Sequence, residues 1–124
     1  MTTNSRKILI VDDEEGIRES LKLILSDEYD LILTDSAQQA LDILDNTDEI
    51  GLVLMDIKMP QIDGLELLKQ IKAKRPDLNA VMITGYKSVE TASEAANLGA
   101  SGYIVKPFKS EEILGTVKRN MTTK

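Results

Sequence analysis

The chain has 124 residues, with 42% apolar and 29% charged, which fits one globular domain and excludes a disordered protein. Cysteine and histidine are absent, which excludes a disulfide scaffold, thiolate chemistry and the commonest general base. The net charge of -6 opposes binding to DNA or to anionic membranes, because both need a basic surface, so we expect no direct nucleic-acid or membrane binding.

Five short apolar runs alternate with five stretches of helical periodicity, and this alternation predicts an α/β fold with a parallel sheet. Most runs are continuously apolar, as is typical of strands that helices cover on both faces. In chain order, the predicted strands are Lys7–Val11, Tyr29–Thr34, Leu52–Met55, Ala80–Ile83 and Gly102–Val105. These runs are too short to cross a bilayer, so we expect a cytoplasmic protein. We also expect one domain over residues 1–124, with its core over about residues 6–121.

The stretches between the strands carry apolar residues at helical spacing. Such residues are Ile17, Leu21, Ile24 and Leu25 in the first predicted helix, Ala37, Ala40, Leu41 and Leu44 in the second, Leu65, Leu68 and Ile71 in the third, and Ile113, Leu114, Val117 and Met121 in the fifth. The fourth is rich in alanine. Ser36 and Asp63 resemble capping-box starts of the second and third helices, and Gly99 stands where the fourth needs a left-handed residue at its end.

Polar residues follow four of the five predicted strands. They are Asp12, Asp13 and Glu14 after the first strand, Asp56 at the end of the third, Thr84 after the fourth and Lys106 after the fifth. In a parallel α/β sheet, ligands bind beyond the carboxyl ends of the strands. We therefore expect these side chains to share one edge of the sheet.

These residue types together suit phosphoryl transfer. Clustered carboxylates repel one another at neutral pH, and a hard divalent cation such as Mg²⁺ offsets that repulsion while it binds their oxygens. Asp12, Asp13 and Asp56 form the predicted metal pocket. A carboxylate can also attack phosphorus and form an aspartyl phosphate, and it needs no general base because it is already ionised. Lys106 and the hydroxyl of Thr84 can hold the remaining phosphoryl oxygens.

Each residue taken alone also has a simpler structural interpretation. The acidic run is equally explained as a solvated turn at a helix N-terminus, where the helix dipole favours carboxylates. Asp56 alone could cap a loop, Thr84 could be an ordinary hydroxyl at a strand end, and Lys106 could be a surface lysine in a Lys-Pro turn. The phosphoryl-transfer interpretation is favoured because all of them fall at the same end of different predicted strands.

Four segments of the chain match one known family in order: VDDEE, LVLMDIKMPQIDGLELLKQIK, VMITGY and GASGYIVKPF. Together they resemble the receiver domain of response regulators in two-component signalling, over almost the whole chain. The resemblance implies a single receiver domain with a flavodoxin-like (βα)5 three-layer sandwich, whose five-stranded parallel sheet has the order 2-1-3-4-5. It also implies that Asp56 is the phosphoacceptor, that Asp12 and Asp13 are the acidic pair around Mg²⁺ or Mn²⁺, and that the backbone carbonyl of Lys58 completes the metal shell.

The same resemblance assigns the switch and the partners. It implies that Thr84 is the hydroxyl that moves toward the phosphoryl group, that Lys106 is its ion-pair partner, and that Tyr103 is the aromatic residue that turns inward on activation. It also implies a cis bond between Lys106 and Pro107. The phosphoryl group would come from a phosphohistidine on a sensor histidine kinase or a phosphotransfer protein. The readout surface would be the face of the fourth helix, fifth strand and fifth helix, which often dimerises in the family.

Two residues beside the predicted phosphoacceptor occupy positions that the family uses to tune hydrolysis, Lys58 and Tyr86. We expect the bulky Tyr86 to slow the attack of water on the phosphoryl group. The stretch from Ile83 to Phe108 is also similar to receivers attached to sigma-54-dependent activators, which is a weak indication of the output.

Two other functions fit parts of the pattern. A metal-dependent aspartyl-phosphate hydrolase of the haloacid-dehalogenase type would carry a second Asp two residues after the nucleophile, where Lys58 stands. A phosphorylation-independent interaction module would have lost some of the acidic pair, the acceptor, the hydroxyl or the lysine, and all are intact. We therefore expect a switch that catalyses its own phosphorylation and dephosphorylation only, and not an enzyme that turns over a substrate.

Overall fold

The computed structural model describes residues 7–121, and within them five parallel strands form one sheet in the order β2-β1-β3-β4-β5. The strands are β1 (Lys7–Val11), β2 (Asp30–Thr34), β3 (Ile50–Met55), β4 (Ala80–Thr84) and β5 (Gly102–Val105). The predicted fold class and strand order are therefore confirmed. The predicted core began at Arg6, which lies outside the described residues.

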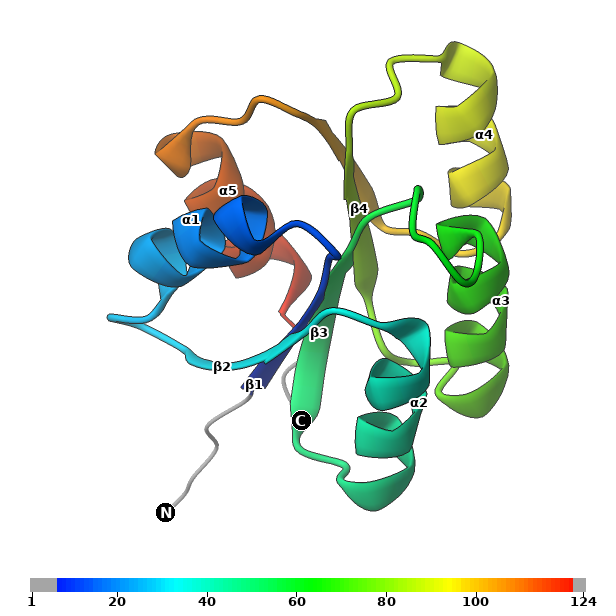
Figure 1. Cartoon of the computed structure of the whole chain (residues 1–124), viewed down its shortest axis with the longest axis horizontal. Helices are drawn as coiled ribbons and strands as arrows, with labels where there is room; N and C mark the ends of the chain where they lie inside the picture. Colours follow the sequence, from blue (N-terminus) through cyan, green and yellow to red (C-terminus); the bar gives the residue numbers. More distant parts are fainter. Residues whose placement is uncertain (1–6, 122–124) are drawn as a thin grey trace.

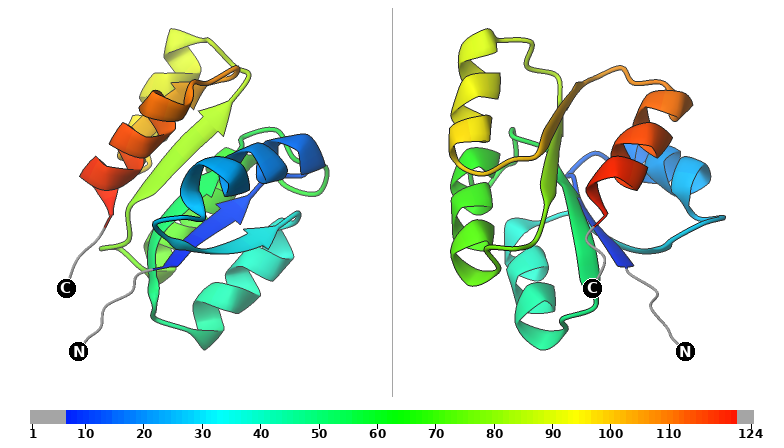
Figure 2. Two further views of the ribbon diagram at one scale, coloured as in Figure 1. Left: turned by 90° about the vertical axis from the view of Figure 1, so that its left-hand side faces the viewer. Right: turned by 180° about the vertical axis from the view of Figure 1, so that it is seen from behind.

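The first four helices each connect two consecutive strands, the last helix follows β5, and together the helices cover both faces of the sheet (Figure 1). They are α1 (Glu15–Leu25), α2 (Ala37–Asn46), α3 (Gly64–Lys74), α4 (Val89–Asn97) and α5 (Ser110–Asn120). Helices α1 and α5 lie on one face, and α2, α3 and α4 lie on the other (Figure 1). The two further views show the same division, so the three-layer sandwich is confirmed (Figure 2). None of the helices within residues 7–121 has the length and apolar character to span a membrane.

Strand β3 differs most from the prediction, because it begins at Ile50 and not at Leu52. Gly51 interrupts the apolar run in the sequence, yet it is buried within the strand. The pairing of β1 with β3 shifts register between Lys7 and Ile8, which accommodates the extra residue. Strand β2 begins one residue later than predicted, because the N–H of Tyr29 still donates to the carbonyl of Leu25 at the end of α1.

Residues on successive positions of a strand pack into different layers. Along β1, Leu9 and Val11 join the cluster under α2, α3 and α4, whereas Ile8 and Ile10 join the cluster under α1 and α5. Every residue of β3 and β4 is buried, which explains why these runs are continuously apolar. Because both faces of the central strands are packed, the strand ends are held firmly, and these ends carry the polar residues.

Most of the predicted helix signals are present in the structure. The hydroxyl of Ser36 accepts a hydrogen bond from the N–H of Gln39, and the carboxylate of Asp63 accepts one from the N–H of Leu65. Gly99 follows α4 with φ of 105°, the left-handed conformation that glycine adopts most readily. The chain also contains the cis peptide bond predicted between Lys106 and Pro107.

Candidate functional site

An open pocket of about 660 Å³ lies at the carboxyl ends of the strands, and its lining comes from several chain segments. Residues from the ends of β1, β3, β4 and β5 contribute to it, among them Glu14, Asp56, Thr84, Tyr86 and Lys106. These strand ends point to the upper edge of the molecule in Figure 1. The pocket is therefore at the edge where the sequence predicts a ligand site.

Three carboxylates meet at this pocket. One oxygen each of Asp12, Asp13 and Asp56 lies within 4.8 Å of the others. Asp12 and Asp56 are buried, and Asp13 is exposed. Burial raises the pKa of Asp12 because it disfavours the charged form, and the hydrogen bond from the N–H of Glu14 and the charge of Lys106 oppose this rise. The cluster thus concentrates negative charge, and little water can screen its two buried carboxylates.

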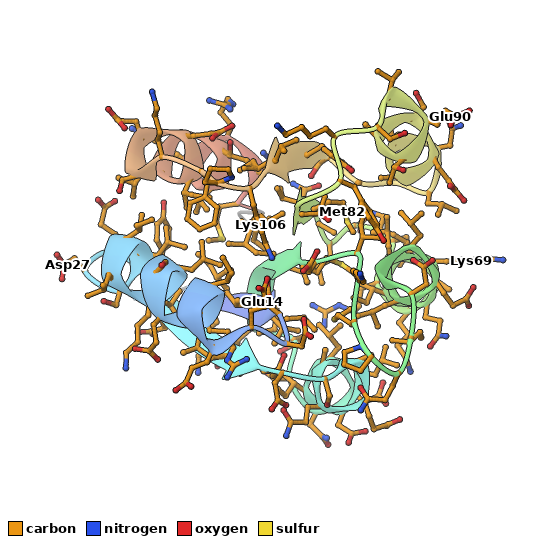
Figure 3. All side chains as sticks on the ribbon, turned by 45° about the horizontal axis from the view of Figure 1, so that its top comes forward. Glu14, Asp27, Lys69, Met82, Glu90 and Lys106 are labelled. Carbon is orange, nitrogen blue, oxygen red and sulfur yellow. The ribbon has the colours of Figure 1, made fainter. Side chains whose placement is uncertain are left out.

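The ammonium group of Lys106 lies between the carboxylates. Its Nζ is 3.0 Å from Oδ2 of Asp56, 3.1 Å from Oδ2 of Asp12 and 2.8 Å from Oε1 of Glu14. Viewed onto this edge of the molecule, the side chains of Lys106 and Glu14 point toward one another (Figure 3). Burial lowers the pKa of Lys106, but the hydrogen bonds to Glu14 and Asp56 and the charges of Asp12 and Asp56 raise it by more. Lys106 is therefore a permanent cation in this site.

The other oxygen of Asp56 is held by the backbone that follows it. Its Oδ1 accepts hydrogen bonds from the N–H of Ile57 at 2.7 Å and from the N–H of Lys58 at 3.4 Å. The N–H of Asp56 donates to the carbonyl of Val11, which ties the end of β3 to the end of β1. These bonds fix the orientation of the carboxylate, with one oxygen on the backbone and the other on Lys106.

Gly64 allows α3 to begin directly beside Asp56. Its N–H donates to the carbonyl of Ile57 at 2.6 Å, and a short antiparallel bridge joins Lys58 to Asp63. A Cβ atom at position 64 would clash with the carbonyl oxygen of Asp56 and would lie 2.6 Å from the Cα of Ile57. The tight loop between β3 and α3 therefore requires glycine at this position.

The two predicted switch residues are linked through the backbone of Tyr86. The hydroxyl of Thr84, which is buried, accepts a hydrogen bond from the N–H of Tyr86 at 3.4 Å. The hydroxyl of Tyr103 donates to the carbonyl of Tyr86 at 2.9 Å. Burial raises the pKa of Tyr103, and the charge of Asp56 adds to this rise. Tyr103 does not line the pocket. Its hydrogen bond to Tyr86, which does line the pocket, connects it to the site.

The structure brings together most of the residues that the sequence singles out. Asp12, Asp13, Asp56 and Lys106 form one cluster, and Thr84 and Lys58 line the same pocket.

Two residues near the cluster have contacts that were not predicted, although Glu14 was expected at this edge of the sheet. Glu14 belongs to the acidic run, whose carboxylates are also explained by the helix dipole, and its contact with Lys106 has no sequence signal. Arg18 donates from Nη1 to the carbonyl of Asp12 at 2.7 Å, and a basic residue on a helix gives no hint of such a contact.

The comparison with protein families identifies the class. The family model described as the response regulator receiver domain matches residues 8–118. This chain belongs to that family, whose members are phosphorylation-dependent signalling switches of two-component systems and not classical enzymes.

Curated relatives are identical to this chain at about a third of the aligned positions. Sporulation initiation phosphotransferase F of Bacillus subtilis (strain 168) is 36% identical over 121 residues, which are 97% of this chain and 97% of that protein. Response regulator protein FleR of Pseudomonas aeruginosa is 36% identical over 115 residues, which are 92% of this chain but 24% of FleR. The chain therefore spans nearly all of one relative and about a quarter of the other.

Solved structures share the fold closely. A CheY-like receiver domain protein from Methanospirillum hungatei JF-1 has a TM-score of 0.87 and 36% identity, over 93% of this chain and 92% of that one. The beryllofluoride-activated NtrC4 receiver domain dimer has a TM-score of 0.88 and 34% identity, over 93% of this chain and 95% of that one.

Proposed function

We propose that this chain is a signalling switch that accepts a phosphoryl group on Asp56 with the help of Mg²⁺ or Mn²⁺. The observation that carries the proposal is the position of Asp56, whose carboxylate lies at an open pocket between two further carboxylates and the ammonium of Lys106. A buried carboxylate in such a place can act as a nucleophile, while the cation beside it offsets the charge of an incoming phosphoryl group.

The donor set at the pocket fits a hard divalent cation. Oxygens of Asp12, Asp13 and Asp56 lie within 4.8 Å of one another, and carboxylate oxygens are the ligands that Mg²⁺ prefers. We assign these three residues, with the backbone carbonyl of Lys58, as the residues that would hold the metal. A metal bound there would neutralise part of the negative charge that gathers during transfer.

The residues of this chain have separate tasks in the transfer. A carboxylate oxygen of Asp56 attacks the phosphorus of the donor, and the bond between phosphorus and the imidazole nitrogen of the donor phosphohistidine breaks, so that the imidazole leaves with the electron pair. Lys106 holds one phosphoryl oxygen with a charge-assisted hydrogen bond, and the hydroxyl of Thr84 holds another. The backbone bonds from Ile57 and Lys58 keep the Asp56 carboxylate in place.

The switch would pass through the loop between β4 and α4. A phosphoryl group carries about 1.5 to 2 negative charges, and because Asp56 loses the charge of its carboxylate, the net gain beside Thr84 and Lys106 is about 0.5 to 1 negative charge. If the hydroxyl of Thr84 turns to the phosphoryl group, it gives up its bond to the N–H of Tyr86, and Tyr86 is also the partner of the Tyr103 hydroxyl. The two bonds to one residue support a coupled movement of Thr84 and Tyr103 between two arrangements.

The partners are proposed from the family and its relatives. We propose a sensor histidine kinase or a phosphotransfer protein as the donor, and a cytoplasmic location for the exchange. The relative from Bacillus subtilis is named a phosphotransferase, which supports a role in phosphoryl exchange. We also propose a homodimer through the face of α4, β5 and α5, and the beryllofluoride-activated NtrC4 receiver domain dimer supports the formation of a dimer.

Labelling with acetyl phosphate and Mg²⁺, followed by intact-protein mass spectrometry, tests the proposal. We expect the mass of one phosphoryl group to be added to the parent chain and to be absent in Asp56→Asn. Asp35→Asn is the matched control, because Asp35 also follows a strand at this edge but lies outside the cluster. Equal labelling of the parent and Asp56→Asn would contradict the proposal.

The alternative of a hydrolase that turns over small substrates has its own test. We expect negligible release of phosphate from small phosphomonoesters, because family members act as switches. Sustained release that depends on Asp56 would favour the hydrolase.

A further inference from the structure

The ammonium of Lys106 has no donor to spare for a phosphoryl oxygen. A lysine ammonium carries three N–H donors. Three carboxylate oxygens accept them, from Glu14 at 2.8 Å, Asp56 at 3.0 Å and Asp12 at 3.1 Å. Modification of Asp56 removes the charge of one of these acceptors, and the phosphoryl oxygens then compete with the two remaining carboxylates, Asp12 and Glu14, for the donors of Lys106.

The two carboxylates that keep their charge differ in the free energy that it costs them to give up Lys106. The side chain of Asp12 is 3% exposed, so its carboxylate would lose a charged partner in a place where little water can replace it. The side chain of Glu14 is 59% exposed, and water can hydrate its carboxylate as soon as the contact breaks. Glu14 is therefore the carboxylate that leaves at the lowest cost, although its contact is the shortest.

The position of Glu14 at a helix start does not explain its contact with Lys106. Glu14 is the N-cap residue of α1, where a side chain often accepts from an N–H of the first turn. Within the described part of the chain, its carboxylate makes no such bond and reaches to Lys106 instead. Its backbone is used locally, because the N–H of Glu14 donates to Oδ1 of Asp12 and its carbonyl accepts from the N–H of Arg18.

We infer that Glu14 is a placeholder for the phosphoryl group. Its carboxylate holds the ammonium of Lys106 over the pocket in the unmodified protein, and a phosphoryl oxygen takes its place when Asp56 is modified. This inference rests on the proposed function of Asp56. Because the bond between Glu14 and Lys106 exists only before modification, Glu14 acts as a positioning residue that favours the unmodified state. Weakening this bond shifts the balance toward the modified state.

Binding of beryllofluoride in the presence of Mg²⁺ tests the inference. Beryllofluoride forms an adduct with a carboxylate oxygen and presents fluorines where phosphoryl oxygens would be, and fluorine NMR reports its affinity. We expect Glu14→Gln to bind it about two- to fivefold more tightly than the parent, the size expected for loss of an exposed ion pair. We expect the same gain for Glu14→Asp, because the shorter side chain keeps the charge but withdraws it from Lys106.

Glu15→Gln is the matched control, since it removes the same charge from the next residue, which is also exposed. It should bind as the parent does. A gain in Glu14→Gln without a gain in Glu14→Asp would overturn the inference, because general repulsion of an anion would then explain the result. A loss of affinity in both Glu14 variants, or no change in either, would also overturn it while the parent still binds. Failure of the parent to bind beryllofluoride and to take label from acetyl phosphate would overturn the proposed function as well.

Discussion

Tyr86 takes part in the site through two separate parts of the residue. Its backbone N–H and carbonyl are bonded to Thr84 and Tyr103, so they belong to the proposed switch. Tyr86 is 43% exposed and lines the pocket, so its ring lies near the place where a phosphoryl group on Asp56 would lie. A substitution that removes the ring leaves both backbone bonds possible. The two roles can therefore be separated.

We predict that Tyr86→Ala shortens the lifetime of the phosphoryl group about fivefold, which corresponds to a barrier lower by about 1 kcal/mol. The reason is that the ring restricts the approach of water to the phosphorus. The measurement is the decay of labelled protein after the donor is removed. Lys87→Ala is the control, because Lys87 is the exposed neighbour outside the pocket lining. A half-life of seconds that is unchanged in Tyr86→Ala would rule out this role.

At the scale of an element, the start of α3 decides where Asp56 lies. The loop after β3 folds back so closely that Gly64 contacts the backbone of Asp56 and Ile57. Such contact gives the helix a fixed position relative to the carboxylate. Any side chain at position 64 must push the loop and the helix apart, and the carboxylate would move with the loop.

We predict that Gly64→Ala destabilises the protein by about 1 to 3 kcal/mol, the usual range for overpacking a filled site. It should also reduce labelling of Asp56 under conditions where the variant is folded. Urea unfolding gives the first quantity, and the initial rate with acetyl phosphate gives the second. Gly16→Ala is the matched control, because a Cβ at Gly16 in the first turn of α1 meets nothing within 4 Å. Alanine there should be neutral or stabilising by up to about 1 kcal/mol. Equal unfolding free energies for the two variants would contradict this account of the loop.

The strands were largely predictable, because a strand that is buried on both faces has a continuously apolar sequence. The apolar runs predicted the first and last residues of β1 and β4 to within one residue. The start of β3 was not predicted, since Gly51 interrupts the run and its place in the strand depends on pairing with β1 across a shifted register. The requirement at Gly64 was also missed, because it depends on a contact between segments and not on a local conformation.

On the scale of the whole molecule, parallel strands explain why the site could be located at all. All five strands end at one edge, so a residue that directly follows a strand must lie near the residues that follow its neighbours. The position of a long side chain beyond that edge follows no such rule. The carboxylate of Glu14 and the guanidinium of Arg18 reach their partners by rotations about several bonds, which no pattern in the sequence specifies.

The carboxylates at this edge should also make the stability of the molecule depend on divalent metal. A ligand that binds only the folded chain stabilises it by about 1.4 kcal/mol when its concentration is tenfold above the dissociation constant. We predict a gain of this size for the parent when MgCl₂ replaces NaCl at equal ionic strength, measured by urea unfolding. Asp13→Asn should lose most of the gain yet leave the stability without metal nearly unchanged, because Asp13 is exposed.

The control for this prediction must carry the same change of charge far from the cluster. Asp27→Asn meets this condition, since Asp27 lies just beyond the far end of α1, away from Lys106 (Figure 3). It should keep the full gain with MgCl₂, because screened charges at that distance contribute little. If the two variants lost the gain equally, the effect of Mg²⁺ would be a general response to net charge. A gain that persists in Asp13→Asn would show that the metal binds without this carboxylate, and the assigned set of metal ligands would be wrong.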